Sequence, residues 1–258
     1  MTKDKNIEYK RYNQRSYEEL NRESPSLDLN VNGAEAIETA IRSPYLFYEE
    51  KLRELIKPGY QVLDLCCGNG IHSIAAAKCG GIVTATDIAE NSLEIAAIRA
   101  KNAGISNMKF VVADAENLPF FDNSFDIVTC VGSISYVDLR IFTSEIKRVL
   151  KPGGFFVCLD SFDHNPIYRF NRFLHYLRGN RSFSTLQRMP NNKTVAFLRE
   201  QFEEFDIYYF GIFSFLGFLG KMLPAERVKT IIDSLDKRFV VFRRYSFKIL
   251  IVARKSTH

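Results

Sequence analysis

The sequence predicts an α/β fold: a doubly wound, seven-stranded, mostly parallel sheet covered by helices on both faces. Strand-like and helix-like segments alternate along residues 44–160, and this alternation is typical of parallel βαβ units. The strand-like segments are almost continuously apolar, as expected for strands buried on both faces. With 258 residues, of which 46% are apolar and 25% charged, the chain has the length and composition to bury such a core.

The predicted elements begin with an extension of the core. Residues 1–43 are charged and tyrosine-rich and lack the strong apolar–polar alternation of a strand, so we expect helices and loops there. An amphipathic helix follows, with Ser43 as its N-cap and Pro44 in its first turn, and ends at the Lys-Pro-Gly sequence of residues 57–59.

The core, residues 44–160, continues with five strands and the helices between them. The strands are predicted at residues 60–65, 81–87, 108–114, 125–131 and 154–160. The helices are predicted at residues 70–79, 90–103 and 139–150.

After residue 160 the alternation breaks. Residues 161–190 contain five arginines, six aromatic residues and one acid, and fit no strand, so we interpret them as a basic, aromatic, helical lid inserted after the fifth strand. Residues 191–258 then complete the sheet. They contain a predicted helix at 192–203 and strands at 205–210 and 245–254 that pair antiparallel at the sheet edge.

The composition limits the cellular compartments and the classes of binding partner that we expect. The net charge of +5 is too small for a histone-like protein, and the polar amino terminus lacks the apolar core of a signal peptide. The apolar stretch at 207–223 is too short for a membrane span, and we expect core packing to explain it. Five cysteines without a CxxC spacing are interpreted as small buried apolar residues in a reducing cytoplasm.

Acidic residues end three successive strands beside a glycine-rich turn. Asp64, Asp87 and Asp114 stand at the carboxyl ends of the predicted first, second and third strands, the edge where doubly wound folds bind ligands. Asp64 would repel a pyrophosphate but hold an amino group or a sulfonium, and Asp87 suits both hydroxyls of a ribose. The alternative is that each acid caps the helix that follows it.

The set of motifs resembles the class I S-adenosylmethionine-dependent methyltransferases. VLDLCCGNG is similar to that family's glycine motif, TATDIA to its ribose-binding acid, and IKRVLKPGGFF to the run into its fifth strand. The phrase LPFFDNSFD is most similar to the branch of the ubiquinone and menaquinone biosynthesis methyltransferases. The resemblance covers about residues 44–160, and it implies the strand order 3-2-1-4-5-7-6, methyltransferase activity and S-adenosyl-L-methionine as cofactor.

The resemblance also implies a set of cofactor-binding residues. They are Asp64, Gly68, Asn69 and Gly70 at the methionine part, Asp87 at the ribose, Ile88, Asp114 and Ala115 at the adenine, and Val131 and Gly132 at the sulfonium end. Cys66 takes a position often filled by glycine, and we expect it to tighten the turn without abolishing binding. His72 either contacts the methionine carboxylate or packs on the amino-terminal segment.

The methyl acceptor is predicted from the lid. We expect a small acceptor with a phosphate or carboxylate, favouring O-methylation, because arginine forks suit such groups. The candidate acceptor-binding residues are Tyr168, Arg169, Arg172, His175, Tyr176 and Arg178. His164 is the first candidate for the base, followed by Asp163 and Tyr136. A turn at His164 and a solvated basic face on the lid are the alternatives.

Three other functions compete with this hypothesis. RNA methylation would use the same basic and aromatic residues, but the fourth motif, CVGSISYV, lacks an Asn/Asp-Pro-Pro-aromatic signature. A lipid or quinone acceptor, methylated on carbon or oxygen, would use the 207–223 stretch as a platform. A non-catalytic partner protein would only bind the cofactor. The four histidines lie far apart in sequence, so we predict no metal.

Overall fold

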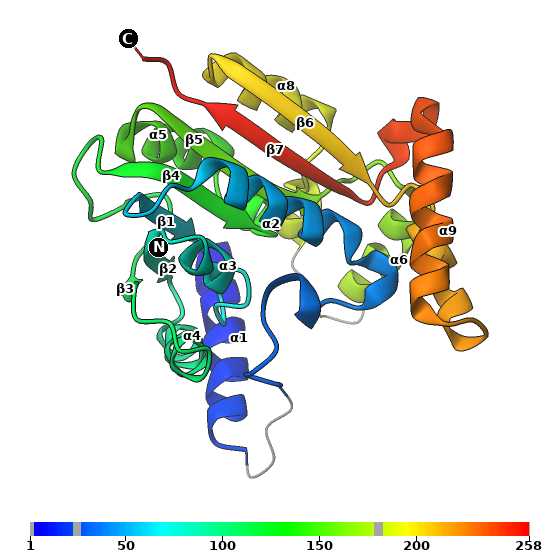
Figure 1. The fold of residues 1–258 in the computed structure, drawn as a ribbon, viewed down its shortest axis with the longest axis horizontal. Helices are drawn as coiled ribbons and strands as arrows, with labels where there is room; N and C mark the ends of the chain where they lie inside the picture. Colours follow the sequence, from blue (N-terminus) through cyan, green and yellow to red (C-terminus); the bar gives the residue numbers. More distant parts are fainter. Residues whose placement is uncertain (1–2, 23–26, 178–182, 258) are drawn as a thin grey trace.

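The sheet has the predicted architecture. The computed structural model describes residues 3–22, 27–177 and 183–257, and its seven strands are ordered β3-β2-β1-β4-β5-β7-β6 (Figure 1). The strands are β1 (Gln61–Leu65), β2 (Ile82–Asp87), β3 (Met108–Val112), β4 (Phe125–Val131), β5 (Leu150–Ser161), β6 (Glu204–Phe210) and β7 (Lys248–Arg254). The first five are parallel, and β7 lies antiparallel to both β5 and β6. The expected fold class and strand order are confirmed.

Helices bury an apolar core on each face of the sheet. The helices that flank the sheet are α2 (Ser43–Leu55), α3 (Ser73–Lys78), α4 (Glu90–Asn102), α5 (Leu139–Val149) and α8 (Asn192–Gln201). On one face, Tyr48 and Leu52 of α2 join α3 and the strands in one cluster. On the other face, Phe142 and Ile146 of α5 join α8 in a second cluster.

Two predicted helix starts differ from the structure. α3 begins at Ser73 rather than at residue 70, because Gly68 and Gly70 take left-handed φ angles of +53° and +75° and extend the turn. α2 begins at Ser43 itself, whose Oγ donates to Asp233 (2.7 Å) instead of capping the helix. That hydrogen bond ties α2 to a distant helix, a contact that local sequence does not reveal.

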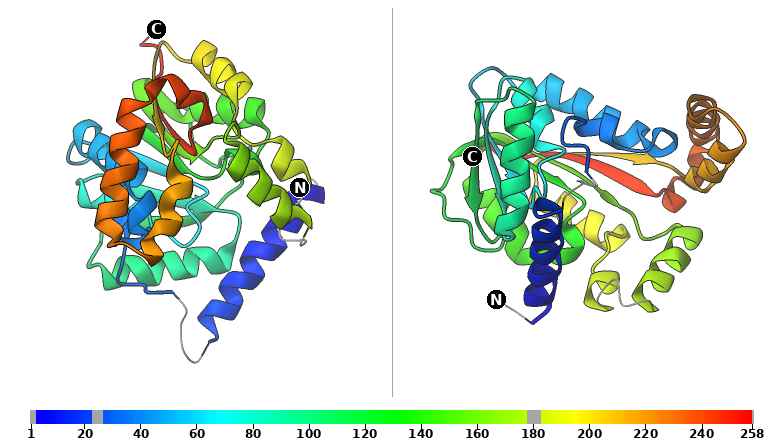
Figure 2. Two further views of the ribbon diagram at one scale, coloured as in Figure 1. Left: turned by 90° about the vertical axis from the view of Figure 1, so that its right-hand side faces the viewer. Right: turned by 90° about the horizontal axis from the view of Figure 1, so that it is seen from below.

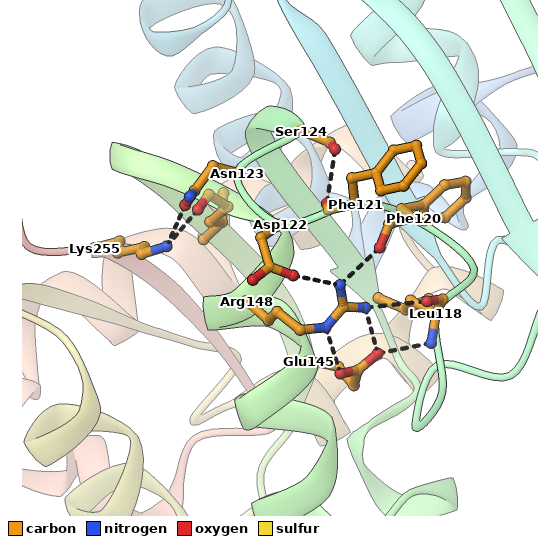
Figure 3. A network of polar contacts seen from close by, with 10 residues as sticks. Leu118, Phe120, Phe121, Asp122, Asn123, Ser124, Glu145, Arg148 and Lys255 are labelled. Atoms are coloured by element: carbon orange, nitrogen blue, oxygen red, sulfur yellow. Dashed lines mark hydrogen bonds and ion pairs between the residues drawn. The ribbon is translucent and has the colours of Figure 1, made fainter.

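Arg148 holds the loop between β3 and β4 in place (Figure 3). Its guanidinium donates to the main-chain oxygens of Leu118 (3.0 Å) and Phe120 (2.7 Å). It also pairs with Asp122 (2.9 Å) and Glu145 (2.8 Å), and this surrounding of acceptors raises the pKa of Arg148. Much of the LPFFDNSFD phrase therefore builds the loop that leads from the third strand end into β4.

The amino-terminal extension forms a long helix and two short 3₁₀ helices, and a third 3₁₀ helix follows β4. α1 (Lys3–Leu20) packs along α4 (Figure 1). The 3₁₀ helices are η1 (Gly33–Ala36), η2 (Thr39–Ile41) and η3 (Ile134–Tyr136). Over the described residues, the helices are too short or too polar to cross a membrane.

Two helical segments lie at one end of the molecule (Figure 2). α6 (Pro166–Leu177) and α7 (Phe183–Gln187) follow β5. Between β6 and β7 lie η4 (Ser214–Lys221), α9 (Ala225–Arg238) and η5 (Val240–Tyr245); we call residues 211–247 the β6–β7 insertion. The expected core packing holds for part of the apolar 207–223 stretch, since residues 207–210 pack against the two core clusters and Ile212 is buried. It does not hold for η4, where none of the residues is buried.

Candidate functional site

A cavity of about 330 Å³ opens at the carboxyl ends of β1, β2 and β4, beneath α1. Its volume lies in the range of small-molecule sites. Most of the expected cofactor residues lie in its lining: Cys66, Gly68, Asn69, Asp87, Ile88, Asp114, Ala115, Val131 and Gly132. The parallel strands bring these positions together because their carboxyl ends lie along one edge of the sheet.

The cavity offers the contacts that a nucleoside requires. Asp87 accepts hydrogen bonds from the main-chain N–H groups of Gly68 and Ala89, both at 2.9 Å. Each carboxylate oxygen keeps a lone pair for a hydroxyl group, and burial raises the pKa of Asp87. At Gly68 and Gly132, no described atom lies within 4 Å of the place where a Cβ would stand. A ligand can therefore approach both backbones closely.

Gly70 has a different task from Gly68. A Cβ at Gly70 would stand 2.7 Å from Cβ and 3.1 Å from Cα of Ala96. The Cα of Gly70 therefore faces α4, and the missing side chain lets the turn pack against that helix. Gly70 is not in the cavity lining, and its contact with the methionine part stays a prediction.

Asp64 lies beneath the turn instead of facing the cavity. Its carboxylate, in a residue only 2% exposed, accepts hydrogen bonds from the hydroxyl groups of Ser73 (2.5 Å) and Thr129 (2.7 Å). Burial raises its pKa to about 6. Both oxygens are thus directed at protein partners that join β1 to α3 and β4, so this geometry favours a positioning role over the expected contact with a sulfonium.

His72 also lies outside the cavity lining. Its ring stacks on Tyr45 at 5.1 Å and meets the edge of Tyr48 at 6.3 Å. Burial, together with the nearby cations Lys248 and Arg99, lowers the pKa of His72 to about 3. His72 thus has a packing role with a neutral imidazole at pH 7, but its aromatic partners belong to α2 of the core and not to the amino-terminal segment of the predicted alternative.

Arg99 is a buried residue that sequence reasoning missed. Its guanidinium donates to the main-chain oxygens of Asn69 (3.1 Å), Val31 (2.6 Å) and Asp28 (3.2 Å). It thereby fastens the glycine turn of the cavity to the segment that follows α1. Its acceptors are main-chain oxygens of residues distant in sequence, so no local sequence motif predicts the contact.

α1 closes one side of the cavity, which was not expected. Its lining residues are Lys5, Glu8, Tyr12, Arg15, Ser16 and Glu19, and their spacing puts them on one face of a helix. Lys5 Nζ lies 2.6 Å from Asp114 and 2.7 Å from Glu116. This spacing of polar residues in the extension is the signal that could have identified α1 as part of the site.

The three candidate bases are separated in space. Tyr136 lines the cavity, and its hydroxyl group accepts a hydrogen bond from Tyr12 (3.0 Å). Burial raises the pKa of Tyr12. Nε2 of His164 accepts a hydrogen bond from the main-chain N–H of Asn192 (3.2 Å), at the start of α8. Asp163 lies 3.6 Å from Arg169. Neither Asp163 nor His164 belongs to the lining of the cavity that contains Tyr136.

A second pocket lies beside α6 and α7. It is lined by Asp163, Arg169, Arg172, Phe173, Leu186, Gln187 and Met189. Arg172 is 6% exposed and donates to Tyr168 Oη (2.6 Å) and Ser161 Oγ (2.9 Å), while its Nε has no partner among the described residues. The ring of Tyr176 lies 6.3 Å from that of Phe173. The His175 side chain and Arg178 lie outside the described residues.

The cysteines divide into two groups. Cys130 and Cys158 are buried, and Cys79 is partly buried against the core. Cys66 and Cys67 line the cavity, so the interpretation of all five as buried core residues is corrected for this pair. All five are free thiols. The described part of the chain holds no group of three or more His, Cys, Asp or Glu residues placed to bind a metal ion.

Comparison with known proteins adds to this geometry. Residues 62–154 match the family described as Methyltransferase domain. A demethylmenaquinone methyltransferase from Staphylococcus aureus is 44% identical over 110 residues, which are 41% of this chain and 45% of that protein. The chain thus spans about half the length of the curated relatives it matches.

Solved structures share the fold at low identity. Phosphoethanolamine N-methyltransferase 2 from Haemonchus contortus, in complex with S-adenosyl-L-methionine, matches with a TM-score of 0.59 and 19% identity, over 82% of this chain and 53% of that one. The [4+2]-cyclase SpnF matches with a TM-score of 0.59 and 18% identity, over 99% of this chain and 94% of that one. Since both reactions occur on this fold, the reaction must be argued from the site.

Proposed function

We propose that the chain is an S-adenosyl-L-methionine-dependent methyltransferase, because residues 62–154 match the methyltransferase domain family. The observation that carries the proposal is the cavity at the strand ends, where Asp87 meets the open glycine positions Gly68 and Gly132. A carboxylate for two ribose hydroxyls, next to backbone that admits close approach, fits an adenosyl cofactor. Asn69 and Ile88 in the same lining support it.

The residues of the chain mainly bind and orient. The cofactor supplies an electrophilic methyl group on a positively charged sulfur. Asp87 would hold the ribose, and the main chain at Val131 and Gly132 would line the reacting end of the cofactor, in a cavity that α1 also lines. The Tyr136 hydroxyl, paired with Tyr12, is the candidate group for orienting an acceptor oxygen. Positioning of this kind supplies most of the rate in an in-line transfer.

For the acceptor, we favour a quinone-class aromatic molecule. The support is the name of the curated relatives, demethylmenaquinone methyltransferase, together with the aromatic and aliphatic side chains Tyr12, Tyr136 and Val137 in the cavity lining. Flat aromatic acceptors pack well against such side chains.

An anionic acceptor is the second candidate. Arg169 and Arg172 line the pocket beside α6, and arginine forks bind phosphate or carboxylate groups. Tyr168 and Ser161 already accept hydrogen bonds from Arg172, which leaves its Nε as the group that an anion would bind.

Methyl transfer in parallel assays tests the proposal. With labelled S-adenosyl-L-methionine, we expect label to enter a lipid extract, whereas an anionic acceptor predicts label in the water-soluble metabolites and RNA methylation predicts label in nucleic acid.

Asp87→Asn should weaken cofactor binding about tenfold, because a neutral amide replaces the charge-assisted hydrogen bonds to the ribose. Glu94→Gln, at an exposed position of α4, is the matched control. Cofactor binding by Asp87→Asn equal to that of the control would contradict the assigned ribose site.

α1 should control the release of the cofactor. Lys5→Ala removes the contacts with Asp114 and Glu116 that fasten α1 over the cavity, so we expect the dissociation rate of bound S-adenosylhomocysteine to rise about tenfold. Lys10→Ala, at an exposed position of the same helix, should leave the rate unchanged. Stopped-flow displacement measures both rates, and equal rates in the two variants would show that α1 does not hold the cavity closed.

A further inference from the structure

The β6–β7 insertion exposes apolar side chains from a helix that also packs inward. Leu216 and Leu219 of η4 pack against Val228 and Ile232 of α9. The other stripe of η4, Phe215 and Phe218, faces outward, because residues three apart align on a 3₁₀ helix. Met222, directly after η4, is 80% exposed. The outward stripe is therefore a stable feature of a helix held by its inner face.

Other exposed apolar residues belong to the same end of the molecule (Figure 2). On η5 they are Val240, Val241 and Phe242, and on α6 they are Ile167, Phe170, Phe173 and Leu177. Phe239 links the segments within the insertion, since its ring lies 5.6 Å from Phe213 and 6.3 Å from Phe242. α6 is fastened to the end of η5 by the hydrogen bond from Asn165 Nδ2 to the Tyr245 oxygen (2.9 Å).

Positive charge is concentrated beside these residues. Residues 214–245 contain seven basic and three acidic residues, a net +4 in a chain whose total is +5. Two of the three acids accept hydrogen bonds within the protein. Asp233 accepts from Ser43 and Lys229, and Asp236 accepts from main-chain N–H groups. The exposed cations are Lys221, Arg227, Lys237, Arg238, Arg243 and Arg244.

We propose that the outer side of the β6–β7 insertion, together with α6, binds the surface of an anionic lipid bilayer. Exposed aromatic and aliphatic side chains enter the headgroup region, and the surrounding cations pair with anionic lipids. Charge complementarity selects this occupant over a second copy of the chain, since two such faces would oppose like charges. Nucleic acid is disfavoured, because aliphatic side chains such as Val240, Val241 and Met222 give its bases no stacking surface.

Vesicle co-sedimentation of the full chain tests the proposal. We expect binding to vesicles of phosphatidylcholine with 30% phosphatidylglycerol, weaker binding to phosphatidylcholine alone, and further weakening by salt. The triple variant Phe218→Ser/Met222→Ser/Val241→Ser should reduce binding at least tenfold. The charge variant Lys237→Glu/Arg238→Glu should reduce binding to the anionic vesicles alone.

The matched control is Phe121→Ser, an aromatic residue 89% exposed in the loop before β4, at the opposite end of the molecule from α9 (Figure 1). It should leave vesicle binding unchanged, and all variants should bind S-adenosylhomocysteine as the unmodified chain does, because these residues lie outside the cavity lining. An absence of vesicle binding, equal losses in the control, or a dimer that the triple variant dissociates would overturn the proposal. The membrane proposal and the methyltransferase proposal can fail separately, since vesicle binding does not require methyl transfer.

Discussion

Replacing Gly70 by alanine is expected to lower the free energy of unfolding by about 3 kcal/mol, while the same change at Gly68 costs about 1 kcal/mol. Both residues have left-handed φ angles, +75° at Gly70 and +53° at Gly68, so both variants carry the backbone cost. Only Gly70→Ala adds a steric cost, since its new Cβ would stand 2.7 Å from Cβ of Ala96. The difference between the variants measures the packing of the turn on α4.

The two glycines should separate again in cofactor binding. A Cβ at Gly68 meets no described protein atom within 4 Å and enters the cavity, so Gly68→Ala should remain folded yet lose most of its affinity for S-adenosylhomocysteine. Denaturant unfolding and calorimetric titration give the two quantities for each variant. Normal cofactor affinity in Gly68→Ala would show that no ligand approaches that backbone, and the cofactor site would have to be placed elsewhere.

The sequence predicts those features that depend on neighbouring residues or on a periodic pattern of apolar residues. Buried parallel strands are continuously apolar, so their positions could be predicted within a few residues. The glycine turn and Asp87 could be found because a sharp turn and a strand-end carboxylate leave signatures in consecutive residues. The sheet then brings these signatures together at one edge, as the cavity lining shows.

The features that the sequence did not reveal depend on contacts between residues far apart in the chain. His164 follows β5 as expected, but its acceptor nitrogen is used by Asn192 at the start of α8. α1 reaches the cavity through contacts with distant residues, among them the ion pairs of Lys5 with Asp114 and Glu116 and the hydrogen bond between Ser16 and Ser92. The apolar residues of η4 divide into an inward and an outward stripe, and composition alone cannot separate the two. Each case depends on which surface the fold provides, which a single segment does not encode.

His72 should make the protein sensitive to acid, and Asp64 should oppose that effect. The pKa of His72 is about 3 in the folded chain, against 6.5 ordinarily. As the pH falls below 6.5, the unfolded chain takes up a proton that the folded chain refuses, so the free energy of unfolding falls. From pH 7 to pH 4.5 this loss amounts to about 3 kcal/mol.

Asp64 has the opposite sign because its folded pKa is raised, to about 6 from 3.8. Between these values the folded chain keeps a proton that the unfolded chain has released, so acidification from pH 7 to pH 4.5 adds about 2 kcal/mol of stability. The unmodified chain therefore combines two effects that largely cancel. Its own pH profile conceals both groups, and only the variants separate them.

Unfolding by denaturant at pH 7 and pH 4.5 should resolve the two contributions. His72→Gln, which removes the ionisable ring, should gain about 3 kcal/mol relative to the unmodified chain on acidification, and Asp64→Asn should lose about 2 kcal/mol. A direct check is the NMR titration of the His72 ring, whose signals should not shift until the pH falls below about 4. If His72→Gln follows the unmodified chain at both pH values, the imidazole is charged and hydrated in the folded state. The packing against Tyr45 and Tyr48 would then not hold in solution.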